Sequence, residues 1–78
     1  MGSRETLEHI VSYLVDHPDE VTVEESESGG SFYYDLFVHP DDIGRVIGRS
    51  GRTARAIRTV VKAAAARESR TVFVEIVD

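Results

Sequence analysis

The sequence predicts a two-layer α+β domain in which three helices cover one face of a three-stranded mixed sheet. Three observations support this fold class. Apolar residues near the start recur at helical spacing, three later segments alternate apolar and polar residues, and a glycine-containing loop separates two helical segments in the second half. The expected order is helix, strand, strand, helix, loop, helix, strand. A length of 78 residues favours a single domain, residues 1–78.

The first helix is expected to begin at Ser3, because serine is a good N-cap and Glu5 would lie in the first turn. One apolar stripe follows along this helix, made of Leu7, Ile10, Val11 and Leu14. The segment His17-Pro18-Asp19 ends the helix.

A β-hairpin is expected next. An acidic strand runs from Val21 to Glu27, a Gly-containing turn follows at residues 28–31, and an aromatic strand runs from Phe32 to Val38. Alternation divides the second strand into two faces. Tyr34, Leu36 and Val38 share one face, and Tyr33, Asp35 and Phe37 share the other.

The second half contains two helices and the last strand. A short helix carries Ile43, Val46 and Ile47 and stops at Gly48. A longer helix is expected from about Arg52 to Ala66. Its apolar face would be Ile57, Val60, Val61 and Ala64, and its basic face Arg52, Arg55, Arg58 and Lys62. The strand from Thr71 to Val77 follows a two-helix crossover, so it should lie parallel to the second strand, which becomes central.

Composition excludes several classes of protein. The chain has no cysteine, which rules out disulfides and thiolate metal sites and favours a cytoplasmic setting. No uncharged stretch is long enough to span a bilayer, so we expect a soluble protein without a membrane partner.

The net charge of −5 is unevenly distributed along the chain. Residues 1–42 hold eleven acids and one base, whereas residues 43–70 hold eight bases and one acid. Salt screens exposed charges beyond about 8–10 Å, so a ligand at the second segment experiences a local positive field despite the acidic total.

The loop Gly48-Arg49-Ser50-Gly51 is the strongest candidate binding site. Two glycines allow a sharp turn and close approach of another backbone. The following helix directs the positive end of its dipole at the loop, and Arg49, Arg52 and Arg55 add cations. These features predict a site for a phosphodiester backbone.

The loop and its surroundings resemble a known family. Ile47-Gly48-Arg49-Ser50-Gly51 between two helices is similar to the Ile-Gly-x-x-Gly loop of KH domains, and the element order resembles their type II arrangement. The run HPDDIGRVIGRSGRTARAIRTVVKAAAAR from His39 to Arg67, with the ending Val74-Glu75-Ile76-Val77-Asp78, resembles the small stand-alone bacterial KH proteins of the KhpA family.

This resemblance implies a type II KH fold and non-catalytic binding of single-stranded RNA, with a role as RNA chaperone or post-transcriptional regulator. The loop would clamp the backbone of about four nucleotides. Matching positions assign RNA contacts to Gly48, Arg49, Ser50, Gly51, Ile43, Val46 and Ile47. Arg52 and Arg55 are expected to contact phosphate because they lie near the loop, unless they belong only to a solvated helix surface. The resemblance also implies self-dimerisation or pairing with a larger Jag-type KH protein.

Simpler interpretations remain open at several positions. The two glycines could only end a helix, and any of Ile43, Val46 and Ile47 could belong to the core instead of a base groove. The aromatic residues Tyr33, Phe37 and Phe73 should share the sheet face away from the helices, as a dimer interface, a base-stacking platform or ordinary surface. Acidic neighbours argue against stacking of RNA bases there. The alternative function is therefore a dimerisation scaffold with weak or no RNA binding.

No enzyme or metal site is expected. A Walker loop needs glycine where Val46 stands and lysine where Arg52 stands. The three histidines, His9, His17 and His39, lack metal-ligand spacing, and two precede prolines in turns. We therefore expect no cofactor, no metal and no small-molecule substrate.

Overall fold

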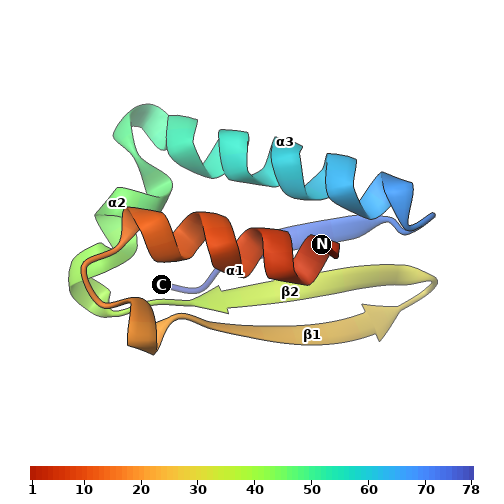
Figure 1. The fold of residues 1–78 in the computed structure, drawn as a ribbon, viewed down its shortest axis with the longest axis horizontal. Helices are drawn as coiled ribbons and strands as arrows, with labels where there is room; N and C mark the ends of the chain where they lie inside the picture. The colour runs from red at the N-terminus through yellow and green to blue at the C-terminus, as the bar shows by residue number, and fades with distance from the viewer.

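One three-stranded sheet, covered on a single face by helices, makes up the computed structural model, which describes all 78 residues (Figure 1). The predicted α+β class and the predicted order of elements are confirmed. The helices and strands are α1 (Ser3–Leu14), β1 (Thr22–Ser28), β2 (Ser31–Phe37), α2 (Ile43–Ile47), α3 (Arg52–Arg67) and β3 (Val72–Ile76). Short 3-10 turns span Pro18–Glu20, Pro40–Asp42 and Arg49–Gly51.

Strand β2 is central, as the crossover predicted. It pairs antiparallel with β1, from Thr22 opposite Phe37 to Ser28 opposite Ser31. It pairs parallel with β3, from Phe32 opposite Val72 to Leu36 opposite Ile76. The helices α2 and α3 make the connection between the two parallel strands, and this places the loop between them at one end of the sheet (Figure 1).

The core lies between the inner sheet face and the helices. Alternate strand residues point inward, and α1 and α3 each contribute one apolar stripe. The largest fully buried hydrophobic side chains are Tyr34, Leu7, Leu36, Val11, Val23, Val46, Val61 and Val72. No helix combines the length and the apolar character that crossing a bilayer requires.

The start of α1 differs from the prediction. Gly2 is the N-cap, and its backbone N–H donates to Glu5 Oε1 at 2.9 Å. Ser3 is the first helical residue instead, and its hydroxyl donates to Glu68 Oε1 at 2.7 Å. The Tyr34 hydroxyl lies 2.7 Å from the Ser3 Oγ and donates to it, because the proton of the Ser3 hydroxyl is engaged with Glu68. Hydrogen bonds from Ser3 lower the pKa of Glu68. Ser3 therefore links α1 to β2 and to the end of α3.

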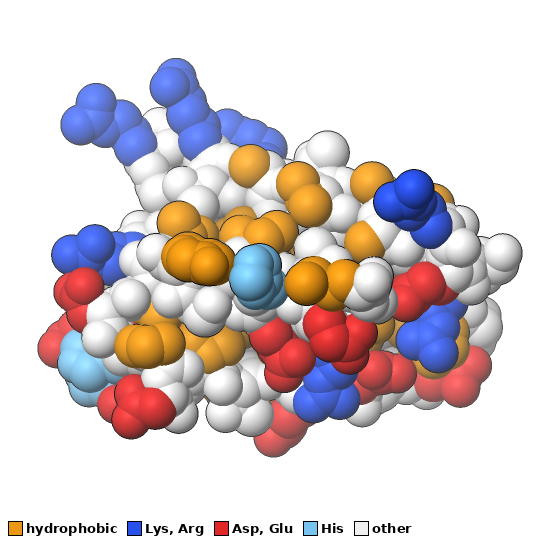
Figure 2. All heavy atoms as spheres, in the orientation of Figure 1, with side chains coloured by type: hydrophobic (Ala, Val, Ile, Leu, Met, Phe, Trp, Pro, Cys, Tyr) orange, Lys and Arg blue, Asp and Glu red, His pale blue; other side chains and the backbone are white.

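The apolar face of α3 is also rotated from the predicted one. Its buried residues are Ala54, Ile57, Val61 and Ala65. Val60, expected in the core, is 46% exposed. It lines a hollow of about 220 Å³ between α1 and α3, together with Ile10, Leu14, Thr53, Ala56 and Ile57. Figure 2 shows hydrophobic side chains along this region of the surface.

Candidate nucleic-acid interface

The loop between α2 and α3 is held in a backbone conformation that needs glycine. Gly48 has φ 74° and ψ 175°, a region that side chains rarely allow. A Cβ added to Gly48 would lie 2.7 Å from the Thr53 Cβ and 3.0 Å from the Thr53 backbone nitrogen. Gly48 therefore lets the first turn of α3 pack directly against the end of α2.

The other residues of the loop reverse the direction of the chain at the tip of the loop. Ser50 has φ 56° and Gly51 has φ 72°, so both lie in the left-handed region. Ser50 is exposed, and its hydroxyl makes no hydrogen bond within the protein. A Cβ at Gly51 would meet only Arg55 Nη1, at 3.8 Å, which places the Arg55 guanidinium beside the loop.

The cations around the loop have no acidic partners. Arg4, Arg45 and Arg70 form ion pairs with glutamates or with Asp16. In contrast, the exposed side chains of Arg49, Arg52 and Arg55 form none. Lys and Arg side chains project from the end of the molecule where α2 meets α3, whereas acidic side chains gather along the opposite side (Figure 2). The end of the molecule that carries the loop is thus positively charged, although the protein as a whole is acidic.

The N-terminus of α3 adds to this field. α3 has 16 residues, its N-cap Gly51 supplies no side-chain hydrogen bond, and its first turn contains no acid. The N–H groups at the start of a helix lack partners within the helix and favour an anion there. Loop, helix terminus and arginines therefore converge on one place.

The three predicted groove residues separate into two kinds. Val46 is fully buried and packs in the core, which is one of the two placements that the sequence left open for it. Ile43 and Ile47 are half-buried on α2. Helical geometry explains the difference, because one apolar residue of this short helix must face the sheet while its neighbours lie at the margin.

The residues of the predicted basic face of α3 differ in their contacts and are not all beside the loop. Arg58 is half-buried, and its Nε donates to the Val74 carbonyl at 3.1 Å. It therefore joins α3 to the edge strand β3. Lys62 lies further along the helix, with its Nζ 5.6 Å from the Phe73 ring centroid. Arg52 and Arg55 remain as the members of this face beside the loop.

Asp42, which sequence reasoning did not assign to the site, fixes the position of α2. Its carboxylate is fully buried. It accepts hydrogen bonds from the backbone N–H groups of Asp16 and His17, at 3.1 and 3.0 Å, and from His17 Nδ1 at 2.9 Å. Arg45 on α2 also pairs with Asp16 at 3.2 Å. The turn after α1 is thereby attached to the helix that leads into the loop. The partners are more than twenty residues away in the sequence, so no local signal indicates them.

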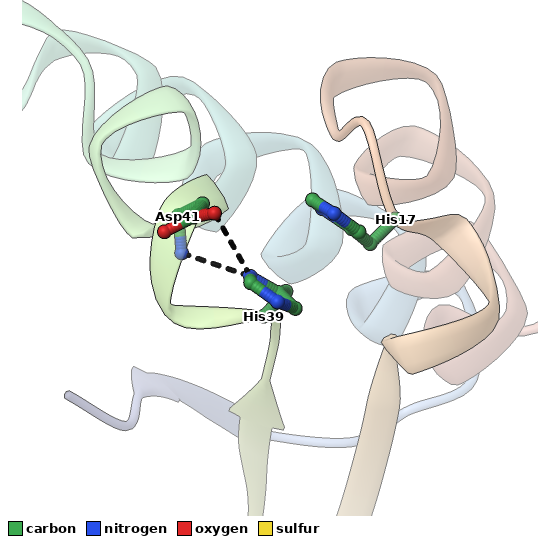
Figure 3. Close-up of side chains that lie close together, drawn as sticks. All are labelled: His17, His39 and Asp41. Carbon is green, nitrogen blue, oxygen red and sulfur yellow. Dashed lines mark hydrogen bonds and ion pairs between the residues drawn. The ribbon is translucent and has the colours of Figure 1, made fainter.

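His17, which bonds the Asp42 carboxylate, also stacks on His39. Figure 3 shows the two imidazole rings with Asp41. Their ring centroids are 3.9 Å apart and their planes differ by 11°. With Asp41 they form a group of three possible metal ligands. However, imidazole lone pairs lie in the ring plane, so nearly parallel rings do not direct them to one point as tetrahedral coordination requires. The Asp41 N–H also donates to His39 Nδ1 at 3.0 Å. We interpret the stack as structural.

The His17–Asp42 pair predicts a pH dependence of stability. The hydrogen bond to Asp42 raises the pKa of His17 above its ordinary value of 6.5, although burial opposes the shift. Burial alone would raise the pKa of Asp42, but hydrogen bonds from Asp16 and His17 lower it overall. The folded state therefore holds the His17 proton more tightly than the unfolded state does.

Because of this sign, the stability from His17 is complete below its unfolded pKa and is lost as the pH rises through the raised folded pKa. We expect the melting temperature to fall as the pH rises above about 6.5, the ordinary pKa of histidine. His17→Gln should flatten this part of the profile, and His9→Gln, an exposed helix position, should not. Thermal unfolding followed by circular dichroism measures both. An unchanged slope in His17→Gln would contradict the assignment.

The three aromatic residues predicted to share the outer sheet face do lie there, but not as one cluster. Tyr33 and Phe73 stack with ring centroids 5.4 Å apart and are 39% and 44% exposed. Phe37 is half-buried and lies four residues beyond Tyr33 along β2. The paired residues Asp35 and Glu75 lie between it and the stack.

Comparison with known proteins now identifies the family. The model described as "KhpA/KhpB, KH domain" matches residues 4–76. The chain belongs to the KhpA/KhpB KH-domain family. The match covers every element from α1 to β3, including the whole loop region. The resemblance proposed from the sequence is therefore confirmed.

Relatives in the KhpA/KhpB family are similar over nearly their whole length. "RNA-binding protein KhpA" of Halalkalibacterium halodurans is 54% identical over 72 residues, covering 92% of this chain and 95% of the relative. The protein of the same name from Clostridium acetobutylicum is 51% identical over 74 residues, covering 95% and 99%. The Streptomyces coelicolor protein of that name is 49% identical over 72 residues, covering 92% and 91%.

A solved structure shares the fold. It is a crystal structure of an Aquifex aeolicus Era variant bound to GDP and AlF4⁻, with a TM-score of 0.65 and 15% sequence identity. The match covers 95% of this chain and 29% of the Era chain. At this identity the likeness concerns the fold alone.

Proposed function

We propose that this member of the KhpA/KhpB family binds single-stranded RNA without catalysing a reaction, through the loop from Gly48 to Gly51. The observation that carries the proposal is the set of unpaired, exposed guanidinium groups of Arg49, Arg52 and Arg55 around a glycine loop at the N-terminus of α3. Relatives that share about half of the sequence carry the name RNA-binding protein, which supports RNA as the ligand.

Each loop residue has a role in this proposal. The glycines let the RNA backbone approach closely. Arg49 pairs with one phosphate, and the Ser50 hydroxyl donates to it. Arg52 and Arg55 lie one turn apart on α3 and meet the neighbouring phosphates. Ile43 and Ile47 form the apolar margin against which bases pack, as in a site for about four nucleotides.

The charge distribution supports a selective role. The acidic first half of the chain repels a polyanion everywhere except at the loop end. A duplex, which presents phosphates over a wide surface, meets more of that repulsion than a short single strand does. We place this activity in the cytoplasm, because the cysteine-free chain suits a reducing compartment. There the protein would act as an RNA chaperone or a post-transcriptional regulator.

Salt dependence tests the proposed contacts. Three or four phosphate contacts predict that log K falls with log salt at a slope of roughly −2 to −3 for a single strand. Fluorescence anisotropy of a labelled RNA oligomer measures this slope, with a duplex of the same sequence as the comparison. Retained binding with a slope near zero would contradict a phosphate cradle.

A protein-interaction module is the second candidate function, through self-pairing or through pairing with a larger Jag-type KH protein. The supporting observation is apolar surface exposed in two places, at Val60 beside the α1–α3 hollow and at the stacked Tyr33 and Phe73. Light scattering of the wild-type chain distinguishes self-pairing from the monomer. Pairing through Tyr33 and Phe73 is compatible with RNA binding, because these residues lie on the sheet face away from the helices. The hollow, in contrast, includes Thr53, which packs against Gly48 of the loop.

A further inference from the structure

The sheet face away from the helices, here called the outer face, is organised in rows across the three strands. One row is Ser26, Tyr33 and Phe73, and the next is Glu24, Asp35 and Glu75. Residues in a row are direct cross-strand partners. No helix covers this face, because all three lie on the other side of the sheet (Figure 1).

The aromatic row offers two flat surfaces to a partner. The Tyr33 and Phe73 rings differ by 22° in plane and together form the largest exposed apolar feature of the sheet. Lys62 reaches the edge of this row from α3, with its Nζ 5.6 Å from the Phe73 centroid. A cation over Phe73 shows that the ring is accessible to positively charged groups.

The acidic row is unusual because like charges lie directly opposite one another. Such pairs destabilise a sheet. None of its three members forms an ion pair, whereas Glu25 on the inner side of β1 is shared by Arg4 at 4.0 Å and Arg70 at 3.8 Å. The outer face therefore holds a line of uncompensated carboxylates beside an exposed aromatic stack.

These charges decide between possible occupants. RNA would bring phosphates against the acidic row. A second copy that presented the same face would bring three more carboxylates, with Lys62 as the cation available at the edge. A partner with guanidinium groups satisfies both rows, because arginine stacks on aromatic rings and forms two parallel hydrogen bonds with a carboxylate.

We propose that the outer face docks an arginine-rich segment of another protein, whose guanidinium groups stack on Tyr33 and Phe73 and pair with Glu24, Asp35 and Glu75. The site is separate from the RNA loop, so a single chain can hold RNA at one end and a basic protein segment on its sheet.

An oligo-arginine peptide is the probe, and an oligo-lysine peptide of the same length is its comparison. Two-dimensional amide NMR of the full chain should show shifts confined to the three strands, around the aromatic and acidic rows, with tighter binding of oligo-arginine. Asp35→Asn with Glu75→Gln should weaken binding about threefold per carboxylate, the range for exposed ion pairs. Phe73→Leu should weaken oligo-arginine binding about twofold to fivefold and weaken oligo-lysine binding less, because the planar guanidinium also stacks on the ring.

Glu27→Gln is the matched control, since Glu27 is an exposed acid on β1 that points to the other face. It removes one negative charge, half of what the double variant removes, and should not affect peptide binding. The acidic-row double variant should also raise the melting temperature of the free chain, because it removes opposed like charges. Glu27→Gln should not.

Three results would overturn the proposal. Equal weakening by Glu27→Gln would show that the peptide responds only to net charge. Shifts at Tyr33 and Phe73 on addition of an RNA oligomer would assign the face to RNA. A dimer mass in light scattering that Phe73→Glu halves would assign it to a second copy. RNA binding measured in the same variants is expected to stay unchanged, so failure here leaves the RNA proposal separately testable.

Discussion

Replacing Arg49 and Ser50 together by aspartate is expected to abolish RNA binding while the fold survives. The change removes a charge-assisted contact, worth about 1.5–3 kcal/mol, and places two carboxylates where a phosphate should lie. We therefore expect a loss of about a hundredfold or more in affinity, measured by fluorescence anisotropy at fixed salt. Both side chains are exposed, so the melting temperature should change little.

A matched control exists at the other end of α3. Arg67→Asp with Ser69→Asp makes the same chemical change at two exposed residues, and Ser69, like Ser50, has a positive φ of 58°. This control should bind RNA with only the modest loss that a change in net charge causes. Equal losses in the two double variants would mean that net charge, and not the loop, governs binding.

Gly48→Ala is expected to destabilise the protein strongly. The φ and ψ of Gly48 belong to a region that costs roughly 1–3 kcal/mol for other residues, and the added methyl would also overlap the Thr53 side chain. We expect a loss of about 3 kcal/mol, a large share of the about 5–15 kcal/mol that stabilises a native domain. Urea unfolding measures the loss as a lower midpoint at unchanged slope.

Gly51→Ala provides the comparison. Gly51 lies in the left-handed helical region with φ 72° and ψ 14°, and nothing but the mobile end of Arg55 approaches its missing Cβ. Its replacement should cost only about 1 kcal/mol. If the two variants lost the same stability, the close packing of Gly48 against Thr53 would not be the reason for a glycine there.

Sequence patterns predicted the structural features that depend on residues close together in the sequence. Period-two alternation placed Tyr34 and Leu36 inside and Tyr33 outside, and the two-helix crossover placed β2 at the centre. The loop was predicted from its glycines because their conformational freedom is a local property. These features follow from the chain within a few residues of each position.

The differences arise where distant segments meet. Ser3 bonds Glu68, 65 residues away, and so does not act as the N-cap. The carboxylate of Asp42 is buried under the turn after α1, where it accepts hydrogen bonds from Asp16 and His17. In each case a polar side chain forms a hydrogen bond with a distant residue that the spacing of the sequence does not indicate.

The rotation of the α3 face has a different cause. Val60 and Val61 are adjacent, and residues 63–66 are all alanine, so hydrophobic periodicity has little contrast with which to choose one stripe over its neighbour. The choice is made by α1 and the sheet, which bury Val61 and leave Val60 at the margin of the hollow between the helices.

The parallel pairing of β2 with β3 also determines when the sheet can be completed during synthesis of the chain. The hairpin of β1 and β2 involves neighbours in sequence and forms early, whereas β3 closes the sheet across both intervening helices. Arg58 holds α3 to β3 through the Val74 carbonyl. Until residues 72–76 have left the ribosome, α3 lacks the strand against which it packs. A nascent chain therefore exposes its basic residues before α3 has the strand against which it packs.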